Sequence, residues 1–160
     1  MIILGIDPGS ERTGYGIVVQ QPRALLKPLT YGCITTPRTK TRAERLLVLE
    51  KELTALLSLY KPDVAAVESL FFFKNLKTVM PVSEARGVIL LTLAKRKLPI
   101  YEFSPLQVKM AITGYGRADK KQVARMVKEI LRLEEIPKSD DAADGLAMAI
   151  AYSLQHKTGA

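Results

Sequence analysis

The sequence predicts one α/β domain in which helices cover a mixed sheet of five strands. The length of 160 residues suits a single domain spanning residues 1–160. The composition, 48% hydrophobic and 25% charged, is that of a globular protein and excludes a disordered chain. Three strand-like segments come first, and helical and strand patterns alternate after them. This order is typical of a mixed sheet with helices on its faces.

The first 35 residues predict three strands. Residues 1–6 form a continuous apolar run that ends in the turn sequence of residues 7–10. Residues 14–19 form a second strand, and residues 30–35 form a weaker third. Because the first connection is short and rich in Gly, Pro and Ser, the first two strands should pair as an antiparallel hairpin.

A helix is expected next, beginning at a capping box formed by Thr41 and Glu44 and ending at Pro62. Residues 63–68 then have the pattern of a buried strand, and residues 100–103 that of a short one. Because a helix is expected between these two strands, they should be parallel.

The remaining helices have amphipathic patterns with start and stop signals. Ser104 and Pro105 begin a helix that Gly114 ends, and Ser139 can cap the last helix. These helices are expected at residues 81–97, 104–114, 120–133 and 139–155.

The charge of the chain indicates a polyanionic partner, since the formal net charge is +8. Residues 71–128 hold twelve Lys or Arg and three acids, whereas the rest of the chain holds twelve and thirteen. This basic block contains an aromatic triplet at residues 71–73, and positive charge beside exposed rings suits phosphates and unpaired bases. The alternative is a set of solvated helix faces.

Several classes of protein are excluded. Cys33 and His156 are the single residues of their types, which excludes an intrachain disulfide and a Cys-rich zinc site and leaves little room for a His-based triad. The first ten residues lack the features of a signal peptide, and no apolar run approaches the roughly 20 residues of a membrane span. A cytoplasmic protein without a membrane partner is expected.

Four carboxylates stand out by their positions. Asp7 and Glu68 each end an apolar strand, and Asp141 and Asp144 share one face of the last helix through their i, i+3 spacing. A carboxylate that closes a buried strand needs a partner, or its pKa rises. Taken singly, Asp7 could form a turn and Asp141 could serve the helix dipole.

Four converging carboxylates would repel one another unless cations neutralised them. Carboxylates and water are ligands that Mg²⁺ and Mn²⁺ prefer. Two such ions about 3.5–4 Å apart could activate an attacking water and stabilise the leaving 3′ oxygen of a phosphodiester. The sequence therefore predicts metal-dependent phosphodiester hydrolysis if the four acids meet in space.

Five motifs occur in order along nearly the whole chain. They are IDPGS at residues 6–10 with Thr13-Gly14, Val67-Glu68 followed by the Phe triplet, EARG at residues 84–87, Tyr115-Gly116-Arg117 through Lys121, and DAADGLA at residues 141–147. Together they resemble the RuvC family of bacterial Holliday-junction resolvases. The last motif beside Asp7 and Glu68 is the specific combination.

The resemblance implies a ribonuclease H-like fold and a homodimeric, Mg²⁺-dependent endonuclease. Such an enzyme makes symmetric paired nicks in four-way junction DNA during homologous recombination and repair, and it leaves 5′-phosphate and 3′-hydroxyl ends. The resemblance further implies two Mg²⁺ ions per active site, replaceable by Mn²⁺, and branch-migration proteins as partners.

The resemblance also assigns the site residues by position. The catalytic and metal-binding acids fall on Asp7, Glu68, Asp141 and Asp144. The family's stacking Phe falls on Phe71, and its functional lysines fall on Lys109 and Lys120. With the neighbouring rings and charges, the expected DNA-binding residues are Phe71, Phe72, Lys74, Lys109, Arg117, Lys120 and Lys121.

The chain departs from the family pattern at Glu84, where Gln is usual, and some relatives have His in place of Asp141. An isologous dimer would supply two equivalent sites for two cuts. The helix around residues 82–93, apolar on more than one side, is the candidate interface, although a simply buried helix would have the same pattern.

Three other functions remain open at this point. The turn at residues 7–10 also resembles the phosphate loop of actin-like and sugar-kinase-like proteins, but those need two such domains around the nucleotide. A DNA-binding module without activity would leave the acids unexplained. A related ribonuclease H-like nuclease acting on RNA is the third alternative.

Overall fold

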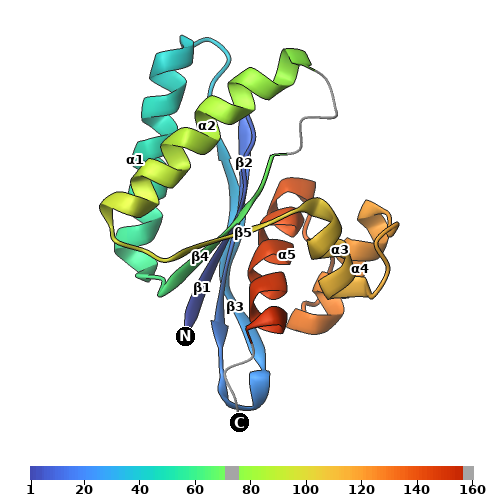
Figure 1. Cartoon of the computed structure of the whole chain (residues 1–160). Coiled ribbons are helices and arrows are strands. Elements are labelled where there is room, and N and C mark those ends of the chain that lie inside the picture. The colour runs from blue at the N-terminus through green and yellow to red at the C-terminus, as the bar shows by residue number, and fades with distance from the viewer. Residues whose placement is uncertain (71–75, 157–160) are drawn as a thin grey trace.

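The computed structural model describes residues 1–70 and 76–156 and has an α/β fold (Figure 1). Its sheet has five strands, as predicted. They are β1 (Ile2–Asp7), β2 (Arg12–Gln20), β3 (Leu26–Thr35), β4 (Val64–Glu68) and β5 (Ile100–Phe103). The helices are α1 (Arg42–Tyr60), α2 (Leu76–Lys95), α3 (Pro105–Thr113), α4 (Lys120–Leu131) and α5 (Asp140–Gln155), with a short 3-10 turn, η1, at Pro22–Ala24. No helix among these residues is long and apolar enough to cross a membrane.

The sheet is mixed, with the strand order β3-β2-β1-β4-β5. β1 pairs with β2 and β2 with β3 in antiparallel fashion, whereas β1, β4 and β5 are parallel. The predicted hairpin and parallel crossover are therefore both confirmed. Because β1 and β4 are parallel neighbours, with Ile6 opposite Val67, their carboxyl ends lie side by side at one edge of the sheet.

Helices cover both faces of the sheet (Figure 1). α1 and α2 cover one face, and α5, with α3 and α4 outside it, covers the other. Successive residues of a strand point to opposite faces. In β1, Ile3 packs in the core beneath α5, and Leu4 packs in the core beneath α1 and α2. Alternation then places Asp7 on the α5 face with Ile3, and Glu68 on the same face with Ala66.

Glycines let α5 lie directly on the backbone of β1 and β2. A Cβ atom on Gly5 would lie 2.1 Å from the carbonyl oxygen of Gly145, and one on Gly14 would lie 1.8 Å from that of Asp141. On the helix side, a Cβ on Gly145 would lie 2.5 Å from the backbone of Tyr15. No side chain fits at these positions. The close contact between the backbones therefore fixes the position of the start of α5 on the sheet.

Most local signals are confirmed. The capping box at the start of α1 is present, since the Thr41 hydroxyl accepts from the Glu44 N–H and the Thr41 N–H donates to the Glu44 carboxylate. Ser104 caps α3, Gly114 ends it in the left-handed conformation, and Ser139 caps α5.

The expected start of α2 at residue 81 is wrong. The described helix begins at Leu76 and contains Pro81 in its interior. A proline removes one hydrogen bond but does not by itself mark a helix start. Packing of Ala85 and Ile89 against the sheet and α1 keeps the helix in place. β2 and β3 are also longer than expected, because their pairing extends from Arg12 opposite Thr35 to Gln20 opposite Leu26.

Candidate active site

Three of the four predicted acids line one cavity of about 270 Å³ at the carboxyl ends of the parallel strands. Asp7 ends β1, Glu68 ends β4, and Asp144 lies in the second turn of α5. The other lining residues are Lys109 and Lys120 with Pro105, Val108, Val123, Ala147 and Met148. The cavity is thus lined by carboxylates and lysines together with apolar side chains.

Burial and mutual repulsion make these carboxylates hard to ionise. Burial, followed by the charges of Glu68 and Asp144, raises the pKa of Asp7 to about 8. Burial also raises the pKa of Glu68, although a hydrogen bond with Asp7 works in the opposite direction. Asp7 therefore favours its protonated form beside Glu68. Full ionisation of these acids is favoured when a cation is added beside them.

The lysines offset part of this charge. The Lys120 Nζ lies 3.2 Å from the Asp144 Oδ2, and it lowers the pKa of Asp144, which burial raises. Lys109 also favours the ionised form of Glu68 and lowers its pKa. Both lysines were predicted to bind DNA, and both lie at the cavity.

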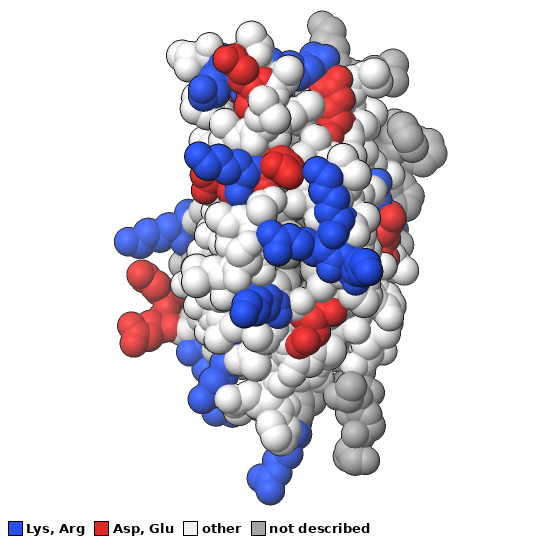
Figure 2. All heavy atoms as spheres, turned by 90° about the vertical axis from the view of Figure 1, so that its left-hand side faces the viewer, with Lys and Arg blue, Asp and Glu red and all other residues white. Residues whose placement is uncertain are grey.

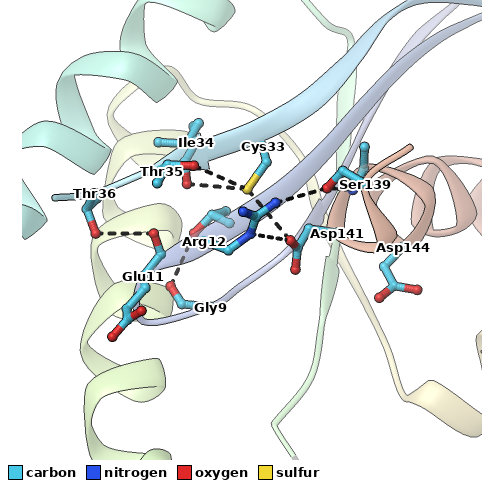
Figure 3. A network of polar contacts seen from close by, with 12 residues as sticks. Gly9, Glu11, Arg12, Cys33, Ile34, Thr35, Thr36, Ser139, Asp141 and Asp144 are labelled. Atoms are coloured by element: carbon cyan, nitrogen blue, oxygen red, sulfur yellow. Dashed lines mark hydrogen bonds and ion pairs between the residues drawn. The ribbon is translucent and has the colours of Figure 1, made fainter. Parts of the chain in front are cut away.

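Asp141 does not line the cavity. Its Oδ2 lies 2.6 Å from the Arg12 Nε, and Arg12 also donates to the Ser139 hydroxyl at 3.2 Å. Figure 3 shows Asp141 joined to Arg12, with Asp144 lying apart from this network. The structure therefore brings Asp7, Glu68 and Asp144 together and holds the fourth predicted acid, Asp141, outside the cavity.

The donor set fits a hard divalent cation. Three carboxylates from three different elements line one cavity, and oxygen ligands are those that Mg²⁺ and Mn²⁺ take. Within residues 1–70 and 76–156, no three acid, His or Cys side chains are already close enough together to hold an ion. Rotation of their side chains would have to bring the three carboxylates closer together before they could bind an ion.

Arg86 supports the site without lining it. Its Nε donates to the backbone carbonyl of Glu68 at 3.3 Å, and its guanidinium also forms an ion pair with Glu102. Glu84, two residues earlier in α2, does not line the acid cavity. One of its carboxylate oxygens accepts from Arg42 at 3.2 Å, and the other is buried without a hydrogen-bond partner among the described residues.

The predicted DNA-binding residues divide into two groups. Lys109 on α3 and Lys120 on α4 line the cavity, whereas Arg117, between these helices, and Lys121, on α4, do not. Arg117, Lys120 and Lys121 are exposed. Phe71, Phe72 and Lys74 lie outside the described residues.

Comparison with known proteins shows the family. The family model for crossover junction endodeoxyribonuclease RuvC matches residues 3–152. The chain belongs to the RuvC family. A RuvC crossover junction endodeoxyribonuclease of Caldicellulosiruptor saccharolyticus is 53% identical over 96% of this chain and 93% of the relative. One of Thermosipho melanesiensis is 52% identical over 97% of this chain and 98% of the relative.

Solved structures of RuvC have the same fold. The Thermus thermophilus RuvC structure has a TM-score of 0.90 and 31% identity, over 99% of this chain and 97% of that chain. The same protein in complex with a Holliday junction substrate has a TM-score of 0.92, over 99% and 96%. The ribonuclease H-like fold implied by the motifs is confirmed, and the kinase-like and RNA-directed alternatives lose their support.

Two residues at this RuvC site were not singled out for these roles from the sequence. Arg12 holds Asp141, and Arg86 holds the end of β4. Alternation along β2 puts Arg12 on the face of Gly14 and Gly16, which could have placed it toward α5. No sequence signal indicates which acid it meets.

Proposed function

We propose that this crossover junction endodeoxyribonuclease cuts four-way junction DNA at the cavity between β1, β4 and α5. The observation that carries the proposal is the gathering of Asp7, Glu68 and Asp144 around one cavity, where burial raises the pKa of each. Buried acids that repel one another do not favour a fold by themselves. Their gathering at one cavity, with raised pKa values, supports a catalytic role.

Asp7, Glu68 and Asp144 would hold divalent cations, Mg²⁺ or in its place Mn²⁺, with two ions in the site and Asp141 as a fourth ligand. When bound, the ions lower the pKa of the attacking water and stabilise the leaving 3′ oxygen. The proton that the raised pKa keeps on Asp7 must leave before this carboxylate can act as a ligand. Hydrolysis in this direction leaves 5′-phosphate and 3′-hydroxyl ends.

The lysines would position the DNA. Lys109 and Lys120 line the cavity, and Arg117 and Lys121 are exposed within a few residues of Lys120 along the chain. Cations at these places can hold backbone phosphates on both sides of the bond to be cut. The stacking of Phe71 or Phe72 on an unpaired base stays a prediction from the family resemblance, as does a phosphate contact of Lys74.

A homodimer would supply the second active site for a symmetric pair of cuts. On α2, Ala85, Ile89 and Leu93 are buried against the sheet and α1, while Met80 and Leu91 are exposed. Figure 2 shows the face of the molecule that α1 and α2 form. Uncharged surface lies between the charged residues of this face. This pattern supports an interface along α2. Branch-migration partners and a cytoplasmic location rest on the family alone.

Substitution of the acids tests the catalytic assignment. Asp7→Asn, Glu68→Gln and Asp144→Asn should each reduce Mg²⁺-dependent nicking of a synthetic four-way junction by more than about 100-fold, because each removes an ionised oxygen ligand. Junction affinity in EDTA should not fall, since the basic residues are intact. The rate is measured on labelled strands and the affinity by fluorescence anisotropy.

Asp140→Asn is the matched control. Asp140 begins α5 one turn before Asp144, is exposed and does not line the cavity. This variant should nick at close to the wild-type rate. Equal losses for Asp140→Asn and Asp144→Asn, or wild-type nicking by Asp7→Asn, would contradict the assignment.

A further inference from the structure

The Asp141 carboxylate is held outside the cavity chiefly by Arg12, with a longer contact from the Cys33 thiol at 3.9 Å. Arg12 binds it through Nε at 2.6 Å and reaches the Ser139 hydroxyl through Nη2 at 3.2 Å (Figure 3). Ser139 is the N-cap of α5, so Arg12 connects β2 to the first turn of this helix at two points. Asp144, three residues after Asp141, lines the cavity.

The position of Asp141 is set by its side chain, because the backbone beneath it cannot shift. A Cβ on Gly14 would lie 1.8 Å from the carbonyl oxygen of Asp141, and one on Gly145 would lie 2.5 Å from the backbone of Tyr15. The first turns of α5 are thus fixed on β2. Rotation of the Asp141 side chain is the available route toward Asp144 and the cavity.

The contact that prevents this rotation is weak enough to be exchanged. The Arg12 side chain is 52% exposed and that of Asp141 is 30% exposed. An ion pair at this exposure contributes at most about fivefold to an equilibrium. The exposed side of the guanidinium is open to another anion, and a planar guanidinium binds a phosphate with two parallel hydrogen bonds.

We propose that Arg12 is a positioning residue that keeps Asp141 away from the ion site until DNA is bound. A backbone phosphate of the junction then takes the place of the carboxylate on Arg12, and Asp141 turns toward the other three acids. Binding of DNA and completion of the acid set are thereby coupled. This inference rests on the proposed function of the cavity.

Mn²⁺ binding without DNA tests the first half of the proposal. Arg12→Ala should tighten Mn²⁺ binding about two- to fivefold in calorimetric titration, because it releases Asp141. The effect is small because the ion pair that is lost is an exposed one. In an Asp141→Asn background, the same substitution should change Mn²⁺ affinity by less than a factor of about 1.5, since the effect acts through Asp141. An unchanged or weakened affinity for Arg12→Ala overturns the proposal.

Arg38→Ala is the control for the loss of a positive charge. Arg38 forms a 2.6 Å ion pair with Glu11, the residue before Arg12, and does not contact Asp141. It should leave Mn²⁺ affinity unchanged. An equal tightening of Mn²⁺ binding by Arg38→Ala would show that the loss of any positive charge causes the effect, and it would contradict the proposal.

Junction binding in EDTA tests the second half. Arg12→Ala should reduce the slope of log affinity against log salt by about one, because one phosphate contact is lost. Arg38→Ala should keep the wild-type slope. An unchanged slope for Arg12→Ala, or an equal fall for both, excludes the exchange of Asp141 for phosphate.

Asp7→Asn separates this inference from the proposed function. If Asp7→Asn binds Mn²⁺ as tightly as the wild type, the cavity is not the ion site and the proposed function fails. If Asp7→Asn loses Mn²⁺ and Arg12→Ala behaves like the wild type, only the role of Arg12 is wrong.

Discussion

At the scale of single residues, the site is governed by one pair of carboxyl groups. Asp7 and Glu68 end parallel neighbouring strands and point to the same face of the sheet, so they meet in a partly buried place. Burial and the nearby acids raise the pKa of Asp7 from its ordinary 3.8 to about 8. The protein without ions therefore carries an acid that is protonated at neutral pH.

This carboxyl should make the ion-free protein less stable as pH rises. Below about pH 4 Asp7 is protonated in both the folded and unfolded chain, and between about pH 4 and 8 only the unfolded chain has lost the proton. The free energy of unfolding should fall across this window by at most about 1.4 kcal/mol per pH unit from this group. Denaturant unfolding in EDTA at pH 5, 6, 7 and 8 measures it.

Asp7→Asn removes this dependence, because Asn has no proton to lose. The stability difference in favour of Asp7→Asn should grow from pH 5 to pH 8 and reach a few kcal/mol. Mg²⁺ should stabilise the wild type at pH 8 and leave Asp7→Asn unchanged. A difference that is constant with pH would show that the carboxyl is already ionised in the folded state.

At the scale of elements, the site depends on how closely α5 approaches the sheet. Asp144 reaches the cavity because α5 lies on β1 and β2 through Gly5, Gly14, Gly16 and Gly145. The strands alone place only Asp7 and Glu68. The helix contact thus completes the acid group.

Gly145→Ala should disturb both packing and activity. Its Cβ would lie 2.5 Å from the backbone of Tyr15, which must shift. We expect a loss of about 2–3 kcal/mol in the free energy of unfolding, as for other overpacked sites, and slower junction nicking because Asp144 moves with α5. Urea unfolding and the nicking rate measure the two effects.

Gly87→Ala is the control on another helix. Gly87 lies in α2, and no atom lies within 4 Å of the place that its Cβ would take. Here Ala should stabilise the protein by up to about 1 kcal/mol through its higher helix propensity. Equal destabilisation by both substitutions would mean that helix propensity and not the close approach of α5 is being measured.

At the scale of the whole molecule, two equivalent sites require two copies of the chain. The exposed apolar residues of α2 offer a surface for the second copy, away from the cavity on the α5 face. On this face, uncharged surface lies between the charged residues (Figure 2). The dimer would then place its two cavities on its outer sides.

Leu91→Lys should weaken this dimer. Leu91 is 56% exposed on α2, and a lysine there would bury a charge in the interface. Sedimentation should give more monomer at equal concentration, with a dissociation constant at least about tenfold higher. Leu106→Lys is the matched control, because Leu106 is 59% exposed but lies on α3. Equal effects of both changes would place the interface elsewhere.

The sequence by itself determined the class of fold, most element boundaries and the three acids that meet. Apolar runs, caps and glycines act over a few residues, so they can be read locally, and alternation along β1 and β4 sets which face Asp7 and Glu68 occupy. The start of α2 escaped this reasoning because contacts of Ala85 and Ile89 hold the helix through Pro81.

Only the tertiary structure decided where Asp141 points and what the acids do to one another. Arg12 and Asp141 are 129 residues apart, and their contact exists because α5 lies on β2 at Gly14. The raised pKa of Asp7 likewise depends on burial and on charges from β4 and α5. Distances between such remote groups follow from packing of whole elements, which no local pattern of residues encodes.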